Sequence, residues 1–178
     1  MRTGLNLVGY QLVWFAAVLG AARGHAEWGL LAGLMFIVAH LMTSAVRRAD
    51  AALAVSAVAL GFVLDGCLSW LGLVEYRAAT SPWPPLWLLA IWASFGLTLN
   101  HSFALSQRHL GLTAAVGAIG GPLAYLAAER LGAVQLALPA WHGVLALALA
   151  WGLVLPLLAG LARGRRFLVR HRADAVVA

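Results

Sequence analysis

The sequence predicts an all-α fold, a polytopic membrane bundle of six transmembrane helices with both termini in the cytoplasm. Composition is the first observation behind this prediction: 63% of the 178 residues are hydrophobic and only 10% are charged, whereas a soluble domain carries about 25% charged residues. The second is a series of six apolar segments, each near the roughly 20 residues that cross a bilayer as a helix. The third is an uneven distribution of arginine between the two sides of such a bundle.

The six segments are joined by short connections, so consecutive helices should be antiparallel neighbours. We expect one transmembrane domain over residues 1–162, followed by a basic cytoplasmic tail over residues 163–178. The expected helices are Leu5–Ala22, Trp28–Val46, Ala51–Val74, Pro85–Leu105, Leu112–Ala128 and Leu138–Ala162.

The first three segments are interpreted as transmembrane helices in turn. The first follows Arg2 and resembles a secretory signal peptide in outline, but Gln11 and Trp14 within the run fit a packed helix better. The charged connections 23–27 and 47–50 delimit the second segment and the start of the third.

The fourth segment should be the central helix of the bundle. It begins after a proline stop and ends in three consecutive hydrogen-bonding side chains, Asn100, His101 and Ser102. Because unpaired polar groups are costly in hydrocarbon, a stripe that combines aromatic and polar residues should face other helices. At helical spacing that stripe consists of Trp87, Ile91, Ser94, Thr98 and His101.

The last two segments each contain a proline, Pro122 or Pro156, which should kink the helix. The fifth segment also offers a face of small residues that allows close contact with another helix. Its members are Gly117, Ala118, Gly120, Gly121 and Ala124.

Arginine placement gives the orientation, since all twelve basic residues are arginines. With a cytoplasmic N-terminus, nine fall on the cytoplasmic side and three on the other, as the positive-inside bias requires. Five of them follow the last apolar run directly. We expect these five to bind anionic lipid headgroups, at about 1 kcal/mol each, and not nucleic acid: Arg163, Arg165, Arg166, Arg170 and Arg172.

Topology converts sequence position into depth, at about 1.5 Å per residue, and predicts two polar layers inside the membrane. The outer layer holds Asp65, with Tyr125 and Trp92 at a similar depth. A buried aspartate should face a partner or a wet cavity, so Asp65 should bind Tyr125, the Trp92 N–H or water, or be protonated. The layer in the cytoplasmic third holds Gln11, His40, Asn100, His101 and Ser102.

Several chemistries are not expected. A metal site needs three or four ligands, and His40 and His101 have no acidic residue expected nearby, so we predict neither a metal nor another cofactor. Ser102 with His40 could imitate a hydrolase dyad, but its geometry is poor. The chain has no nucleophile elbow, phosphate-binding loop or dinucleotide fingerprint.

The leading hypothesis is a binding or accessory protein whose bundle holds an amphipathic lipid or similar apolar ligand. The ligand tail would lie near Trp14 and Trp92, and its polar end near His40, Asn100 and His101. One alternative is an enzyme that modifies a membrane lipid with His40 or His101 as the base. Others are a transporter with Asp65 and the histidines as a proton relay, and a scaffold for a protein partner in the membrane.

Five stretches also carry a family resemblance. The chain resembles, over nearly its whole length, a bacterial family of small polytopic inner-membrane proteins catalogued as a domain of unknown function. The resemblance implies association with genes similar to fatty-acid-modifying methyltransferases and flavin amine oxidases, and hence with membrane-lipid metabolism; it implies no catalytic residues. The stretches are Tyr10-Gln11-x-x-Trp14, Leu64-Asp65, Pro85-Leu86-Trp87-Leu-Leu-Ala-Ile-Trp92, Leu99-Asn100-His101-Ser102 and Gly120-Gly121-Pro122-Leu-Ala-Tyr125.

A second resemblance is local. Trp83-Pro84-Pro85-Leu86-Trp87, followed by Trp92, is similar to the tryptophan-proline region of the translocator protein family, five-helix binders of porphyrins and sterols. This chain differs in having six segments and in placing the motif before the fourth.

Overall fold

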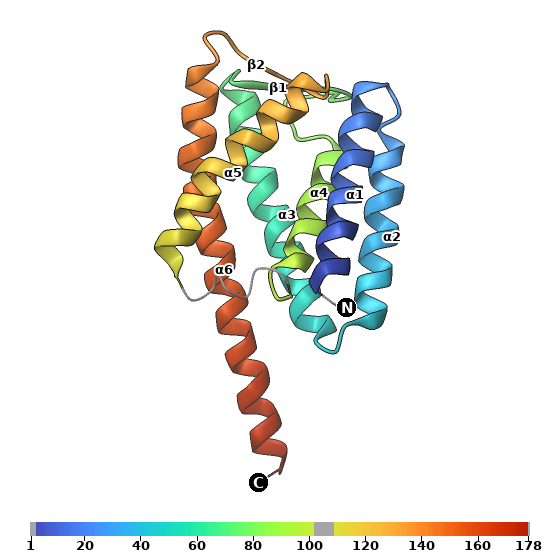
Figure 1. Cartoon of the computed structure of the whole chain (residues 1–178), viewed down its shortest axis with the longest axis vertical. Coiled ribbons are helices and arrows are strands. Elements are labelled where there is room, and N and C mark those ends of the chain that lie inside the picture. The colour runs from blue at the N-terminus through green and yellow to red at the C-terminus, as the bar shows by residue number, and fades with distance from the viewer. Residues whose placement is uncertain (1–2, 102–108, 178) are drawn as a thin grey trace.

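The computed structural model describes residues 3–101 and 109–177, with side chains described for residues 4–101 and 109–164. In that part of the chain, six helices form a bundle that is closed at one end by a two-stranded ribbon (Figure 1). The elements are α1 (Thr3–Ala22), α2 (Glu27–Thr43), α3 (Arg47–Trp70), β1 (Val74–Tyr76), α4 (Leu86–Thr98), α5 (Leu110–Arg130), β2 (Val134–Leu136) and α6 (Trp141–Val177).

Four of these helices are long and apolar enough to cross a membrane. They are α1, α3, α5 and the first 24 residues of α6. Their outward faces carry large apolar side chains, among them Leu12, Val55 and Leu153, each more than 60% exposed. Such a surface suits hydrocarbon and not water. The expected all-α bundle is therefore confirmed, with four helices of spanning length.

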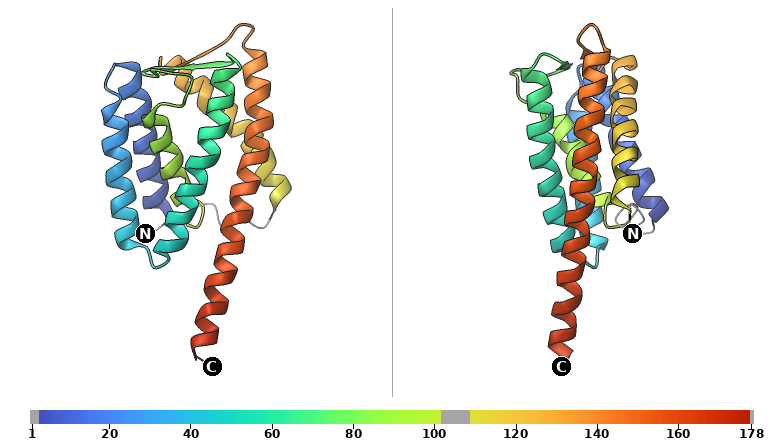
Figure 2. Two further views of the ribbon diagram at one scale, coloured as in Figure 1. Left: turned by 180° about the vertical axis from the view of Figure 1, so that it is seen from behind. Right: turned by 90° about the vertical axis from the view of Figure 1, so that its left-hand side faces the viewer.

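The fourth segment is central, as predicted, but its helix is shorter than expected. Figure 2 shows α4 enclosed between α1, α2 and α3, and most of its side chains are buried. The helix ends at Thr98, not at Leu105, and spans 13 residues. The chain turns at residues 99–101 because Asn100 and His101 direct their side chains to an aspartate at the start of α3.

The antiparallel ribbon was not expected, since residues 75–84 and 129–137 were interpreted as connections. β1 pairs with β2 in the register Val74↔Leu136, Glu75↔Gln135 and Tyr76↔Val134. In both strands the outer two residues are buried and the middle one is exposed, which is the alternation of a half-buried strand. The ribbon covers the end of the bundle where α3 and α5 end (Figure 1).

Glycine allows close helix contacts at the bundle centre. A Cβ at Gly61 of α3 would lie 2.3 Å from the Trp92 ring, and one at Gly121 of α5 would lie 2.2 Å from the Trp151 ring. Gly117 packs as closely on the α6 backbone, so the predicted small-residue face of α5 does contact α6. Gly120 does not belong to this contact, because a Cβ there would meet no atom within 4 Å.

The start of α1 and the far end of α6 lie at the same end of the bundle, opposite the ribbon (Figure 1). Helix α6 continues past the other helices without a break (Figure 2), so the expected basic tail is a continuation of the last helix.

Candidate functional site

The first candidate site surrounds Asp50 at the start of α3. Its carboxylate is fully buried and bonded to four side chains. The Nε2 atoms of His40 and His101 each lie 3.1 Å from Oδ2. We call Asp50, these four side chains and Asn6, which contacts His40, the Asp50 cluster. Its members are Asn6, His40, Ser44, Asp50, Asn100 and His101.

The remaining contacts tie four segments of the chain together. Ser44 Oγ donates to Asp50 Oδ2 at 2.5 Å, and Asn100 Nδ2 donates to Oδ1 at 2.8 Å. Behind His40, Asn6 Nδ2 lies 2.9 Å from the second ring nitrogen, Nδ1. The two imidazole rings are edge to face, with centroids 4.9 Å apart. The cluster thus joins the start of α1, the end of α2, the start of α3 and the turn after α4.

This cluster partly confirms the predicted inner layer. His40, Asn100 and His101 do converge from two segments. Gln11 does not join them, because its side chain is exposed and lies on the side of α1 that faces α5. Ser102 lies outside the described residues.

The expectation of no acidic residue beside the histidines is wrong. Asp50 was assigned to a connection, but α3 begins three residues earlier, at Arg47, so Asp50 lies in its first turn. A carboxylate there is favoured by the helix dipole. The signal was present in the sequence: Leu53 and Ala57 follow at helical spacing, and both are fully buried. Asp50 therefore belongs to the inward face of α3.

The second candidate site surrounds Asp65, which is also fully buried. Trp92 Nε1 donates to Oδ2 at 2.7 Å, Tyr76 OH donates to Oδ1 at 2.9 Å, and Tyr125 OH donates to Oδ1 as well. The predicted partners Tyr125 and Trp92 are confirmed. Tyr76 was missed because it lies on the unexpected ribbon. Burial and the Asp65 charge raise the pKa of Tyr76 well above its usual value, so this phenol remains a donor. We call these four residues the Asp65 cluster.

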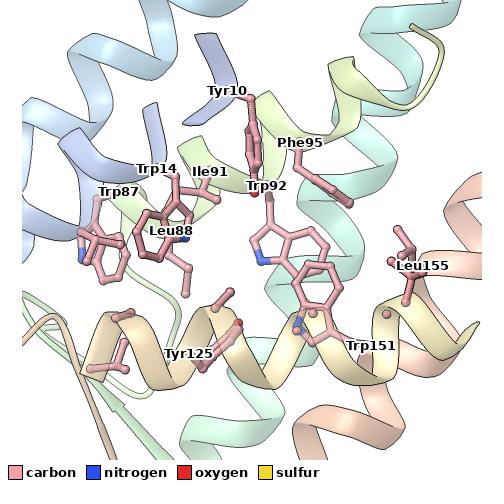
Figure 3. Close-up of a pocket in the computed structure, with 18 residues that line it drawn as sticks. Tyr10, Trp14, Trp87, Leu88, Ile91, Trp92, Phe95, Tyr125, Trp151 and Leu155 are labelled. Carbon is pink, nitrogen blue, oxygen red and sulfur yellow. The ribbon is translucent and has the colours of Figure 1, made fainter. Parts of the chain in front are cut away.

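Two members of the Asp65 cluster also line an apolar cavity of about 180 Å³ between α1, α4, α5 and α6 (Figure 3). Trp92 stacks on Trp151 at its centre, with ring centroids 4.7 Å apart. The Trp151 indole N–H is buried and has no hydrogen-bond partner in the described part of the chain. We call this space the aromatic cavity. Its ring-bearing walls are Tyr10, Trp14, Trp87, Trp92, Phe95, Tyr125 and Trp151.

A wider groove lies beside the aromatic cavity, between α1 and α5, with a volume of about 630 Å³. The two spaces share Tyr10, Trp14 and Ala124 as lining residues. Gln11 lies along this groove, and Arg130 contributes a cation from the last turn of α5. We call it the lateral groove.

The expected ligand position is therefore divided between two places. Trp14, Trp92 and Tyr125 line the aromatic cavity as a ligand tail would require. His40, Asn100 and His101 do not line the aromatic cavity, because their side chains point to Asp50 in the first turn of α3. Sequence position gave each residue a depth but not the direction of its side chain around the helix axis.

Comparison with curated proteins and with solved structures finds no match. A family model described as "Protein of unknown function (DUF2878)" matches residues 3–157. That range includes both aspartate clusters and all residues that line the aromatic cavity. The match covers most of the chain, and this protein belongs to the DUF2878 family.

Proposed function

We propose that this protein is an integral membrane protein of the bacterial inner membrane that holds the hydrocarbon part of an amphipathic lipid in the aromatic cavity, as an accessory to membrane-lipid metabolism. The observation that carries the proposal is an apolar cavity lined by seven aromatic side chains and adjoined by a groove between two membrane helices. Ligand sites are typically apolar spaces with a few directed polar groups.

The polar groups at this site suit a lipid with acceptor oxygens. Trp151 Nε1 is a buried donor without a partner in the described structure, and burying such a group costs about 1–3 kcal/mol. An ester or carboxyl oxygen of a ligand would accept this hydrogen bond. Arg130, on the lateral groove, would attract an anionic headgroup.

In this proposal all six helices cross the membrane and both termini are cytoplasmic. Helix α4 rises only about 20 Å over its 13 residues, so its flanking residues must complete the crossing. Non-helical backbone is tolerated at membrane depth where protein surrounds it, and α4 is surrounded by α1, α2 and α3. An even number of crossings also agrees with the start of α1 and the end of α6 at one end of the bundle (Figure 1).

The geometry supports binding over the alternatives. An acid/base enzyme would need His40 or His101 beside the ligand, and neither lines the aromatic cavity. A proton relay would need to connect the two aspartates, which are about 22 Å apart along α3. A lipid-modifying enzyme would change the chemical structures found in a deletion strain, whereas a binder would change lipid amounts or locations.

The test is a substitution that blocks the cavity without disturbing the fold. Gly120 lines the aromatic cavity, and a side chain there starts in open space. We expect Gly120→Leu to lower the lipid that copurifies per chain about tenfold, equivalent to about 1.4 kcal/mol. Quantitative mass spectrometry of protein extracted into native nanodiscs gives the measurement.

Gly160→Leu is the matched control, since a Cβ at Gly160 also meets no atom within 4 Å and this residue does not line the cavity. It should retain the lipid of the wild-type protein. Equal lipid content in the two variants would overturn the proposal.

A further inference from the structure

The Asp50 cluster contains a set of side chains that the proposed function does not use. His40 Nε2, His101 Nε2 and an Asp50 carboxylate oxygen all lie within 4.8 Å of one another. We propose that these three atoms bind a divalent transition metal ion of the Zn²⁺ type, at the end of the bundle opposite the ribbon (Figure 1).

The spacing of the three atoms fits such an ion. In a tetrahedral zinc site the ligand bonds are about 2.0–2.1 Å, so neighbouring ligand atoms lie roughly 3.3 Å apart. Both N···O distances are 3.1 Å. The two ring nitrogens lie within 4.8 Å of each other, so all three atoms are close enough to surround one ion. Two histidines and one carboxylate are also a common protein donor set for catalytic zinc.

The charge balance favours a cation here. Asp50 is fully buried, and the ion pairs formed by the described residues give it only His40 and His101 as partners. Arg47 is nearby in sequence but donates to the backbone carbonyls of Met42 and Ser44 instead. Because a buried carboxylate is costly without a compensating charge, a divalent ion would compensate it.

Asn6 gives His40 the support that a metal-bound imidazole needs. A ligating histidine usually bonds its second ring nitrogen to a neighbouring group, which fixes the tautomer. The Asn6 amide lies 2.9 Å from His40 Nδ1. With its oxygen turned toward the ring, Asn6 accepts the Nδ1 proton and leaves the Nε2 lone pair for the metal.

A fourth ligand position is available beside Asp50. The Asn100 side-chain oxygen is buried and has no hydrogen-bond partner among the described residues, although its amide nitrogen bonds Asp50 Oδ1. An amide oxygen in this place would bind the ion directly or accept a hydrogen bond from metal-bound water. The His101 side chain is 20% exposed, which provides a route for the ion from the end of the bundle.

The experiment uses the full chain in nanodiscs, stripped with EDTA and then titrated with Zn²⁺ or Co²⁺. We expect one Zn²⁺ per chain by mass spectrometry of the metal, and a Co²⁺ visible spectrum of low-coordinate, nitrogen-ligated type. His101→Gln should weaken Zn²⁺ binding about 100-fold. His101 is the preferred variant because it is the only partly exposed member of the three.

His142→Gln is the matched control, since His142 is an exposed histidine outside the cluster. It should bind Zn²⁺ like the wild-type protein. The Co²⁺ spectrum of the unmodified chain keeps the test decisive if His101→Gln does not fold. A spectrum identical to that of aqueous Co²⁺, or equal Zn²⁺ affinity in the two variants, would overturn the proposal. The Asp50 cluster would then be a hydrogen-bonded group that binds no metal. Lipid retention in the Gly120→Leu test is independent of either result.

Discussion

Helix α3 carries two fully buried aspartates in surroundings of different chemistry. Asp65 receives hydrogen bonds from two phenols and an indole. An indole N–H can only donate, and a neutral phenol is a poor metal ligand. Asp50 receives bonds from imidazoles, an amide and a hydroxyl. Imidazole and amide groups can exchange donor and acceptor roles by tautomer change or rotation.

The comparison teaches that burial alone does not define what an aspartate does. The partners of Asp65 are an indole and two phenols, all of which donate to it, so this carboxylate orients Trp92 and Tyr125 and thereby shapes two walls of the aromatic cavity. The partners of Asp50 are adaptable, so its cluster can accommodate a cation. The Asp65 cluster therefore supports the walls of the aromatic cavity, whereas the Asp50 cluster is itself a candidate binding site.

The largest expected effect comes from removal of the fixed acceptor. Asp65→Ala removes the shared acceptor of three buried donors, which should lower the free energy of unfolding by about 3–5 kcal/mol. Asp50→Ala in metal-free protein should cost less, because His101 reaches solvent and the amide and imidazole partners can reorient. Unfolding titrations in mixed detergent micelles measure both values, and a larger loss for Asp50→Ala would reverse the comparison.

Metal removal should distinguish the Asp50 cluster from the Asp65 cluster by a smaller change in the stability of the fold. If Zn²⁺ binds the Asp50 cluster, a hundredfold excess over its dissociation constant stabilises the fold by about 2.7 kcal/mol. We expect EDTA to lower the thermal midpoint of the wild-type protein and of Tyr76→Phe by the same amount. His101→Gln should show no shift with either Zn²⁺ or EDTA. An equal shift in His101→Gln would assign the stabilisation to another part of the chain.

Much of the fold was predictable because the length and apolar composition of membrane helices can be recognised in the sequence. The six segments and the central position of the fourth were predicted from apolar runs and from Pro84-Pro85. The short ribbon was not, because a three-residue alternation such as Val74–Tyr76 is too brief to separate from a loop. Its partner Val134–Leu136 is about 60 residues away in the chain, and local pattern does not encode such a pairing.

The candidate sites were predictable only in part, for a related reason. Depth follows from residue count, so His40 and His101 could be placed at one level. Helix starts are less certain by a few residues, and that error moved Asp50 from the inward face of α3 into a connection. Tyr76 was missed for the same reason as the ribbon that carries it. The unpartnered Trp151 N–H is a property of packing, which no sequence pattern records.

The smallest expected effect concerns the lateral groove beside the aromatic cavity. Arg130 lies on the lateral groove, and a basic side chain near the membrane surface contributes about 1 kcal/mol toward anionic lipid. Arg130→Gln should therefore reduce copurified anionic lipid about fivefold relative to zwitterionic lipid, with total lipid little changed. Arg23→Gln, an exposed arginine after α1 that does not line the groove, is the control. A similar loss in both variants would show a general surface effect, and the groove would then have no part in selecting the headgroup.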